Sequence, residues 1–124
     1  MTQRQYNGPT TKKGWYTSGD RKYYLKSSWE LSYAQYLDSE LLNGKIVEWE
    51  YEPDTFWFDR IKRGVRSYTP DFKVKYLDGK VQYHEVKGYL DSKSKTKLNR
   101  MRIYHPEIEM ILIDRAVMKS LRLL

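Results

Sequence analysis

The sequence predicts one domain of the α/β class, an α+β arrangement in which helices flank a mixed sheet. Two observations predict it: alternating stretches typical of strands lie between stretches with helix signals, and two of those strands are joined by an Asp-Gly turn. The expected order is helix, three strands, helix, strand, helix. The chain has 124 residues, enough for a single core.

The first 26 residues are predicted to form a basic N-terminal arm, ahead of a single domain over residues 27–124. The arm has one acid, Asp20, against six cations: Arg4, Lys12, Lys13, Arg21, Lys22 and Lys26. A loose leader is the alternative, since chain ends are commonly held weakly. Its aromatic residues favour packing or exchange with a partner over free disorder. Lys12 and Lys13 are candidate DNA contacts.

The first helix is predicted from about Ser28 to Leu42. Ser27 and Glu30 have the spacing of a capping box, and Asn43-Gly44 is a stop signal. A strand is predicted next, over residues 45–53, because apolar and acidic side chains alternate until Pro53. One face carries Val47, Trp49 and Tyr51, and the other carries Glu48, Glu50 and Glu52.

The later elements follow the same signals. Residues 67–76 and 80–88 alternate and are separated by Leu77-Asp78-Gly79, which predicts an antiparallel hairpin. Asp91 can cap a helix over residues 92–105, which should end before Pro106. A buried strand over 108–113 and a short helix over 116–124 complete the prediction. The basic and aromatic segment 55–66 has no predicted element.

The net charge of +7 and the pI near 9.5 favour a polyanionic partner, with nucleic acid as the first candidate. A membrane surface is the rival, but the longest aliphatic stretch, Met110–Ile113, is far too short to span a bilayer. No membrane partner is therefore expected. The first residues have no apolar signal-peptide core, so we expect a cytoplasmic protein, in the host cell if a phage encodes it.

The absence of cysteine excludes disulfides, thiolate nucleophiles and every Cys-based zinc site. The two histidines, His84 and His105, are too few for a three-histidine zinc site or an HExxH helix. Carboxylates are the remaining metal ligands, and they suit hard cations such as Mg²⁺ or Mn²⁺.

Asp71, Glu85 and Lys87 are the candidate catalytic residues. Alternation places Glu85 and Lys87 on one face of the third strand, with Val86 directed into the core. Asp71, in the hairpin partner, can approach the same face. Phosphodiester hydrolysis needs such a group, because carboxylates hold a divalent cation that polarises the phosphate and lowers the pKa of bound water. The lysine ammonium can orient the water and offset the charge of the transition state.

These residues resemble the signature of the PD-(D/E)xK nuclease superfamily, which reads here as Pro70-Asp71 and then Glu85-Val86-Lys87. The resemblance implies a restriction-endonuclease-like core and one or two Mg²⁺ or Mn²⁺ ions, bound by Asp71, Glu85 and the backbone carbonyl of Val86. It also implies that Lys87 serves the water that acts as the nucleophile. Glu30 matches the acid that the preceding helix often supplies, although helix capping is its structural alternative. Glu50 would contribute to a second metal position, with a solvated strand charge as the alternative.

Within the superfamily, residues 24–113 are most similar to short phage junction-resolving endonucleases of the endonuclease I type. The similar segments are YLKSSWE, EYE, YTPDF, EVKG and YHPEIEMILI. This implies cleavage of branched DNA by a homodimer, since two symmetric incisions require two sites. Two alternatives stay open: a sequence-tolerant or sequence-specific nicking endonuclease of phage or mobile-element origin that cuts duplex DNA, and a catalytically inactive DNA-binding module with the same fold.

The second predicted helix is crowded with cations, and it begins directly after the catalytic strand. Charge runs are usually solvated, but phosphate contact would explain this excess beside the proposed site. The candidates are Lys93, Lys95 and Lys97, followed by Arg100 and Arg102. Of the histidines, His84 is expected to face away from the site as a packed or hydrogen-bonded imidazole, and His105 to interact with carbonyls at a helix end.

Overall fold

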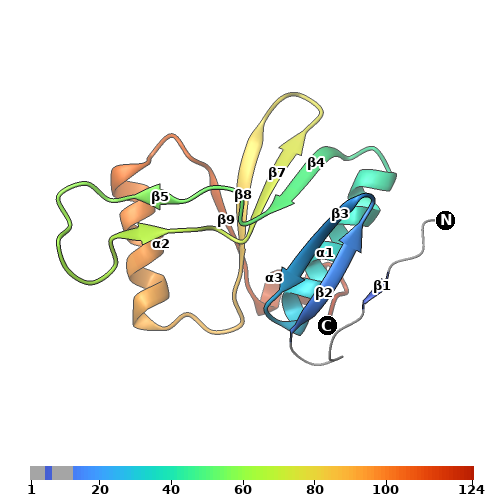
Figure 1. Ribbon diagram of the computed structural model, residues 1–124, viewed down its shortest axis with the longest axis horizontal. Coiled ribbons are helices and arrows are strands. Elements are labelled where there is room, and N and C mark those ends of the chain that lie inside the picture. Colours follow the sequence, from blue (N-terminus) through green and yellow to red (C-terminus); the bar gives the residue numbers. More distant parts are fainter. Residues whose placement is uncertain (1–4, 7–12) are drawn as a thin grey trace.

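The computed structural model describes residues 5–6 and 13–124, which form a mixed α and β architecture with three helices (Figure 1). The elements in chain order are β1 (Gln5–Tyr6), β2 (Gly14–Ser18), β3 (Arg21–Leu25), α1 (Ser28–Leu42), β4 (Ile46–Tyr51), β5 (Phe56–Trp57), β6 (Ser67–Tyr68), β7 (Phe72–Tyr76), β8 (Val81–Val86), α2 (Ser92–Tyr104), β9 (Met110–Ile113) and α3 (Arg115–Ser120). Helices and a mixed sheet are both present, which confirms the predicted class.

The central sheet has the strand order β4-β7-β8-β9. β7 pairs antiparallel with both β4 and β8, whereas β9 is parallel to β8 and is reached through α2. The predicted hairpin is confirmed. Its turn contains Gly79 at φ +87°, and the Tyr76 amide donates to the Lys80 carbonyl at 2.8 Å. Gly79 therefore supplies the backbone conformation that side-chain-bearing residues rarely adopt.

Helix α1 has the predicted bounds, and its apolar side packs against one face of the central sheet. Ser27 Oγ accepts a hydrogen bond from the Glu30 amide at 3.1 Å, which caps the helix. Tyr33 and Leu37 from the helix are buried in one core with Phe72 and Val74 from β7. This packing fixes the start of α1 at the end of the sheet where Asp71 enters β7.

The predicted facing of β4 is wrong at Val47. The pairing of β4 with β7 shifts between Ile46 and Glu48, and an extra residue in a strand reverses the alternation on one side of it. Ile46 is consequently buried, while Val47 is 44% exposed. Trp49 and Tyr51 are buried and share one face, as predicted for these two residues.

Residues 14–25, in the predicted N-terminal arm, form the antiparallel hairpin of β2 and β3. Tyr16 and Leu25 are fully buried in the same core as α1 and the central sheet. The carboxylate of Asp38 in α1 accepts hydrogen bonds from the Tyr16 hydroxyl, from Ser18 Oγ at 2.5 Å and from Trp49 Nε1 at 2.9 Å. The described part of this segment is therefore packed on the domain.

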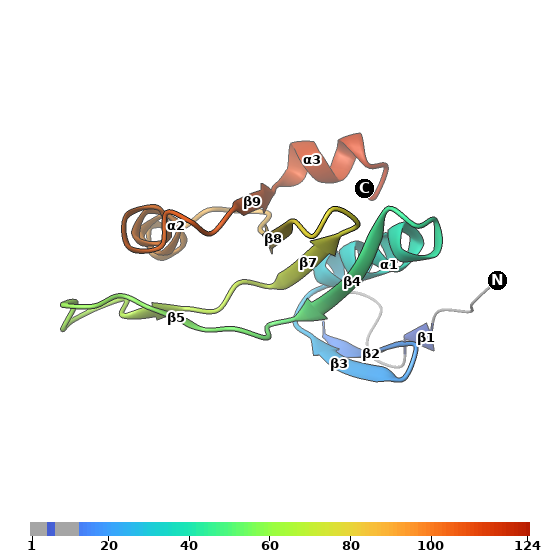
Figure 2. The ribbon, with the colours of Figure 1, turned by 90° about the horizontal axis from the view of Figure 1, so that it is seen from above.

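The segment without a predicted element forms a second, smaller unit. β5 and β6 pair antiparallel, and Figures 1 and 2 show this hairpin reaching away from β1–β3, on the side of α2. Phe58, Tyr68 and Met101 of α2 form a buried cluster of their own. The strand β9, expected to be buried, lies at the sheet edge, and of its four residues only Ile113 is buried.

Candidate active site

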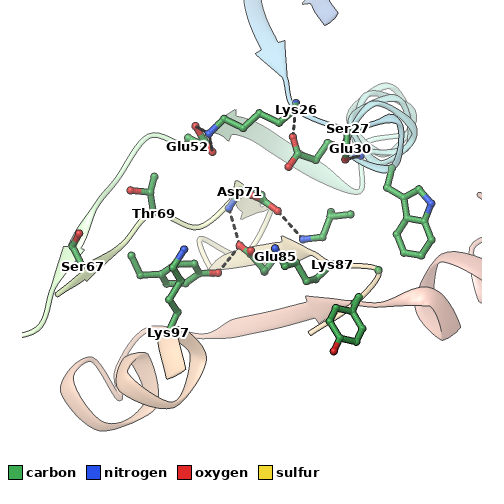
Figure 3. A pocket seen from close by; sticks show the side chains of 15 residues that line it. Lys26, Ser27, Glu30, Glu52, Ser67, Thr69, Asp71, Glu85, Lys87 and Lys97 are labelled. Atoms are coloured by element: carbon green, nitrogen blue, oxygen red, sulfur yellow. Dashed lines mark hydrogen bonds and ion pairs between the residues drawn. The ribbon is translucent and has the colours of Figure 1, made fainter. Parts of the chain in front are cut away.

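A cleft of about 810 Å³ opens where α1 begins, β4 ends and β8 ends. Figure 3 shows the side chains that line it, with Asp71 and Glu85 next to each other and Lys97 reaching in from α2. The lining residues are Lys26, Ser27, Trp29, Glu30, Glu52, Ser67, Tyr68, Thr69, Asp71, Glu85, Val86, Lys87, Gly88, Tyr89 and Lys97. The structure thus brings Glu30, Asp71, Glu85 and Lys87 into one place, as expected.

Hydrogen bonds from neighbouring amides and a tyrosine hydroxyl hold the carboxylates of Asp71 and Glu85 in place. Asp71 Oδ2 accepts from the Val86 amide at 2.9 Å, and Glu85 Oε1 accepts from the Asp71 amide at 3.3 Å. Glu85 Oε1 also accepts from the Tyr68 hydroxyl at 2.5 Å. Asp71 Oδ1 and Glu85 Oε2 accept no hydrogen bond from any residue that the structure describes, so each carboxylate keeps an oxygen for a ligand.

Burial perturbs both carboxyls, and repulsion by neighbouring carboxylates adds to the perturbation of Asp71. Burial, together with the charges of Glu85 and Glu30, raises the pKa of Asp71 to about 9. Burial also raises the pKa of Glu85, although the Tyr68 hydroxyl, the Asp71 amide and the ammonium of Lys87 oppose that shift. Two close carboxylates in a poorly solvated site cannot both ionise readily, so they retain a proton near neutral pH.

Lys87 lies on the same side of β8 as Glu85 and is partly exposed in the cleft. Its amide donates to the Ile113 carbonyl at 3.0 Å, which ties the end of β8 to β9. The backbone at Lys87 is therefore fixed, while its flexible side chain can reach a bound group. A cation here lowers the pKa of Glu85 by Coulomb attraction.

Glu30 is both a structural and a cleft residue. Its Oε1 accepts hydrogen bonds from the Lys26 amide at 2.9 Å and from the Tyr51 hydroxyl at 2.7 Å. In a capping box the Glu30 side chain would accept from the amide of the N-cap residue, Ser27. Here it accepts from the amide of Lys26 instead. Glu30 is 7% exposed, and its charge contributes to the raised pKa of Asp71.

Glu50 does not line the cleft; it lies opposite Lys73 in the register of β4 and β7. The neighbouring acid in the cleft is Glu52, which the sequence prediction missed as a site residue. The Glu52 amide donates to the Asp71 carbonyl at 2.8 Å, and its carboxylate pairs with Lys26 Nζ at 2.9 Å. Glu52 lies just beyond the end of β4 with φ +50°, so the alternation of the strand could not have identified it.

Most of the predicted DNA contacts lie on α2, but they differ in their surroundings. Lys97 lines the cleft, with its Nζ 5.8 Å from the centre of the Tyr68 ring. Lys13, Lys93, Lys95 and Arg102 are exposed. The Arg100 guanidinium donates to the Val65 carbonyl, so part of its hydrogen-bonding capacity is used within the fold. Lys12 lies outside the described residues.

The two histidines take no part in the cleft. His84 is buried on the α1 side, with Nδ1 2.6 Å from the Tyr33 hydroxyl and Nε2 3.0 Å from Gln82 Oε1, which confirms the expected packed imidazole. Burial lowers the pKa of His84 to about 4. The ring of His105 lies against β5, with Nε2 2.8 Å from the Trp57 carbonyl. His105 is also the C-cap of α2, and its amide donates to the Met101 carbonyl at 2.8 Å, so the expected interaction with a helix-end carbonyl is made by the backbone.

Within residues 5–6 and 13–124, no three Asp, Glu or His side chains are arranged closely enough to form a ready metal site. Asp71 and Glu85 nevertheless suit a hard cation such as Mg²⁺, which is held by one or two carboxylates and keeps several waters. The raised carboxyl pKa values fit this donor set, since a cation would relieve the repulsion that causes them.

Comparisons with protein-family models, with curated proteins and with solved structures gave no match to this chain. None of the described helices is of a length and apolarity that would let it cross a membrane. The fold and the cleft define a small α+β domain with a buried aspartate, a partly buried glutamate and a lysine at one end of its sheet.

Proposed function

We propose that the protein is a Mg²⁺- or Mn²⁺-dependent DNA endonuclease with a restriction-endonuclease-like core, which hydrolyses phosphodiester bonds in the cleft. The observation that carries the proposal is the convergence of Asp71, Glu85 and Lys87 in the cleft, where Asp71 is buried, Glu85 is partly buried beside it, and the charge of Glu85 raises the pKa of Asp71. Strongly perturbed groups that gather in a cleft are typical of functional sites.

Asp71 and Glu85 would hold the cation through Asp71 Oδ1, Glu85 Oε2 and the backbone carbonyl of Val86. The hydrogen bonds from the Val86 amide and the Tyr68 hydroxyl keep the two carboxylates in place before the cation arrives, as ligand orientation requires. The bound cation would polarise the phosphate and lower the pKa of the attacking water.

Lys87 would orient the attacking water and offset the negative charge that grows on the phosphate in the transition state. It projects from the same face of β8 as Glu85, so its ammonium serves the group that the carboxylates hold. Glu30 acts beside them: it adds negative charge to the site and fixes the Tyr51 hydroxyl. Lys97, across the cleft on α2, can bind a neighbouring phosphate.

The pair of carboxylates also favours an active enzyme over an inactive DNA-binding module. Holding two like-charged carboxyls out of water lowers stability, and a module that only bound phosphate would gain nothing from negative charge in its basic surface. Two substrates are compatible with the proposal: branched DNA, cut by a homodimer, and ordinary duplex DNA, nicked on one strand. The same metal-dependent hydrolysis would cut both, and the two differ in the shape of the DNA that enters the cleft.

A substrate panel tests the proposal. Labelled four-way junctions and linear duplexes of the same sequence are incubated with the protein in Mg²⁺ and in EDTA. We expect cleavage that requires the metal and is lost by at least about 100-fold in Lys87→Ala, with DNA binding retained. Lys119→Ala, an exposed lysine of α3, is the matched control and should cut normally. Preference for the junction would indicate junction resolution, and equal cutting would indicate a nicking enzyme. The absence of cutting on both substrates would contradict the proposal.

A further inference from the structure

The positive charge of the protein is concentrated in two segments that sequence and fold place together. The loop 58–66 and helix α2 contain nine Lys or Arg residues and a single acid, Asp59, a formal charge of +8, whereas the whole chain carries +7. Of the remaining residues, the predicted N-terminal arm 1–26 is also basic, with six cations and one acid, and the others carry a net negative charge. We call the cations of the loop and of α2 the basic platform: Arg60, Lys62, Arg63, Arg66, Lys93, Lys95, Lys97, Arg100 and Arg102.

The cations of the basic platform are not neutralised within the fold. Four ion pairs join the residues that the structure describes, and each of them uses a cation from elsewhere: Arg21, Lys26, Lys73 and Lys80. The four cations of the loop are exposed, as are Lys93, Lys95 and Arg102. Helix α2 contains no acid within its length, and a single carboxylate, that of the N-cap Asp91, stands at its start. A polyanion is the ligand that such a surface suits.

The loop and the helix are fixed to each other, so their charges act as one surface. Phe58 and Met101 share a buried cluster, against which Ile61, Val65 and Leu98 are packed. The Arg100 guanidinium donates to the Val65 carbonyl. His105 Nε2 lies 2.8 Å from the Trp57 carbonyl, which ties the end of α2 to β5. Figures 1 and 2 show the hairpin and α2 on the side of the sheet away from β1–β3.

The basic platform is continuous with the cleft. Tyr68 belongs to the buried cluster of the platform, and its hydroxyl donates to Glu85 at 2.5 Å. Lys97 belongs to α2 and lines the cleft. Helix α2 has 13 residues, roughly 20 Å at 1.5 Å per residue, so a strand that passes through the cleft could follow the platform for several phosphates.

We infer that the basic platform binds the sugar-phosphate backbone of a DNA duplex flanking the bond that is cut. We choose a duplex over a single strand because single strands are held by stacking on several aromatic rings, and the hairpin that carries the loop exposes one large ring, Trp57, at 62%, against four exposed cations of the loop. Contacts of this kind position DNA without reading its sequence. The inference rests on the proposed nuclease function for the position of the cut, but the binding itself requires no cleavage.

The test measures binding of a labelled 30-base-pair duplex in EDTA at several salt concentrations. The platform variant is Arg60→Gln, Lys62→Gln and Arg63→Gln combined. The control variant combines Lys45→Gln, Lys75→Gln and Lys119→Gln. It removes the same charge from exposed sites outside the platform. Each phosphate contact contributes about 0.9 to the slope of log affinity against log salt. We expect the slope to fall by about 2 to 3 in the platform variant and by less than about 1 in the control.

The inference would be overturned if the salt slope fell equally in the two variants. It would also be overturned if the platform variant lost affinity for a single strand of the same length but kept its affinity for the duplex. Circular dichroism of both variants shows whether each is folded. The outcome is separable from the proposed function. Wild-type protein that binds duplex through the platform but never cuts with Mg²⁺ would contradict only the nuclease, and normal cutting with an unchanged salt slope in the platform variant would contradict only the platform.

Discussion

Replacing Asp71 with asparagine should stabilise the metal-free protein, because the native fold holds this carboxyl in an environment that disfavours its charge. Its pKa rises from 3.8 to about 9 through burial and the charges of Glu85 and Glu30. A folded-state pKa above the unfolded value means that the unfolded chain loses its proton first. The stability of the wild type is therefore lost progressively as the pH rises from 3.8 towards 9.

The magnitude follows from about 1.4 kcal/mol for each pH unit between the two pKa values. At pH 7 only the interval from 3.8 to 7 counts, which corresponds to about 4 kcal/mol; because Asp71 titrates together with Glu85, we take about half of this, about 2 kcal/mol, for Asp71 alone. Asparagine keeps an oxygen that can accept from the Val86 amide. A gain of about 2 kcal/mol corresponds to a Tm increase of about 5–10 °C for a chain of this size.

The assay is urea denaturation of the wild type, Asp71→Asn and the control Asp59→Asn in EDTA from pH 5 to pH 8. Asp59 is exposed, so its replacement tests the same change of side chain without burial. The stability of Asp71→Asn relative to the wild type should increase with pH, and the control should follow the wild type. A difference that stays constant or falls as the pH rises would refute the reasoning.

Four further predictions follow from the same contacts. Tyr68→Phe removes the hydroxyl that lowers the pKa of Glu85, so the pH profile of cleavage should move to higher pH while the melting temperature changes by only a few degrees. Glu52→Gln should reduce the cleavage rate at limiting Mg²⁺ more than Glu50→Gln, because only Glu52 lines the cleft. The pKa of His84, lowered to about 4, means that the wild type loses about 2 kcal/mol of stability as the pH falls from 6.5 to 5, and His84→Gln should reduce that loss in urea denaturation. Phe72→Ala, at a fully buried side chain in contact with the rings of Tyr33, Trp49 and Tyr51, should cost about 3–5 kcal/mol, measured by the same method.

Periodic elements with clear end signals could be predicted from the sequence. Helix α1 begins after Ser27 because a side-chain oxygen satisfies a free amide there, and α2 begins after Asp91 for the same reason. The Asp-Gly turn set the register of the hairpin, and the register brought Asp71 near Glu85. The core of the candidate site therefore follows from local signals alone.

Other features depend on tertiary contacts that no local pattern encodes. β5 and β6 have two residues each, too few for an alternation to be recognised, and they are held by their packing against α2. The irregularity at Val47 reverses one side chain without any glycine or proline to mark it. Glu52 adopts φ +50° just beyond β4, and its ion pair with Lys26 joins two elements that are 26 residues apart in sequence.

Binding of Mn²⁺, measured by calorimetry at pH 7 in two buffers with different ionisation enthalpies, tests most directly whether the carboxylate pair is a metal site. The wild type should bind Mn²⁺ and release protons into the buffer, since Asp71 and Glu85 must lose their shared proton to coordinate a cation. Asp71→Asn should lose this binding, and Asp59→Asn should retain it. The same heat in all three proteins, or no binding by the wild type, would contradict the account.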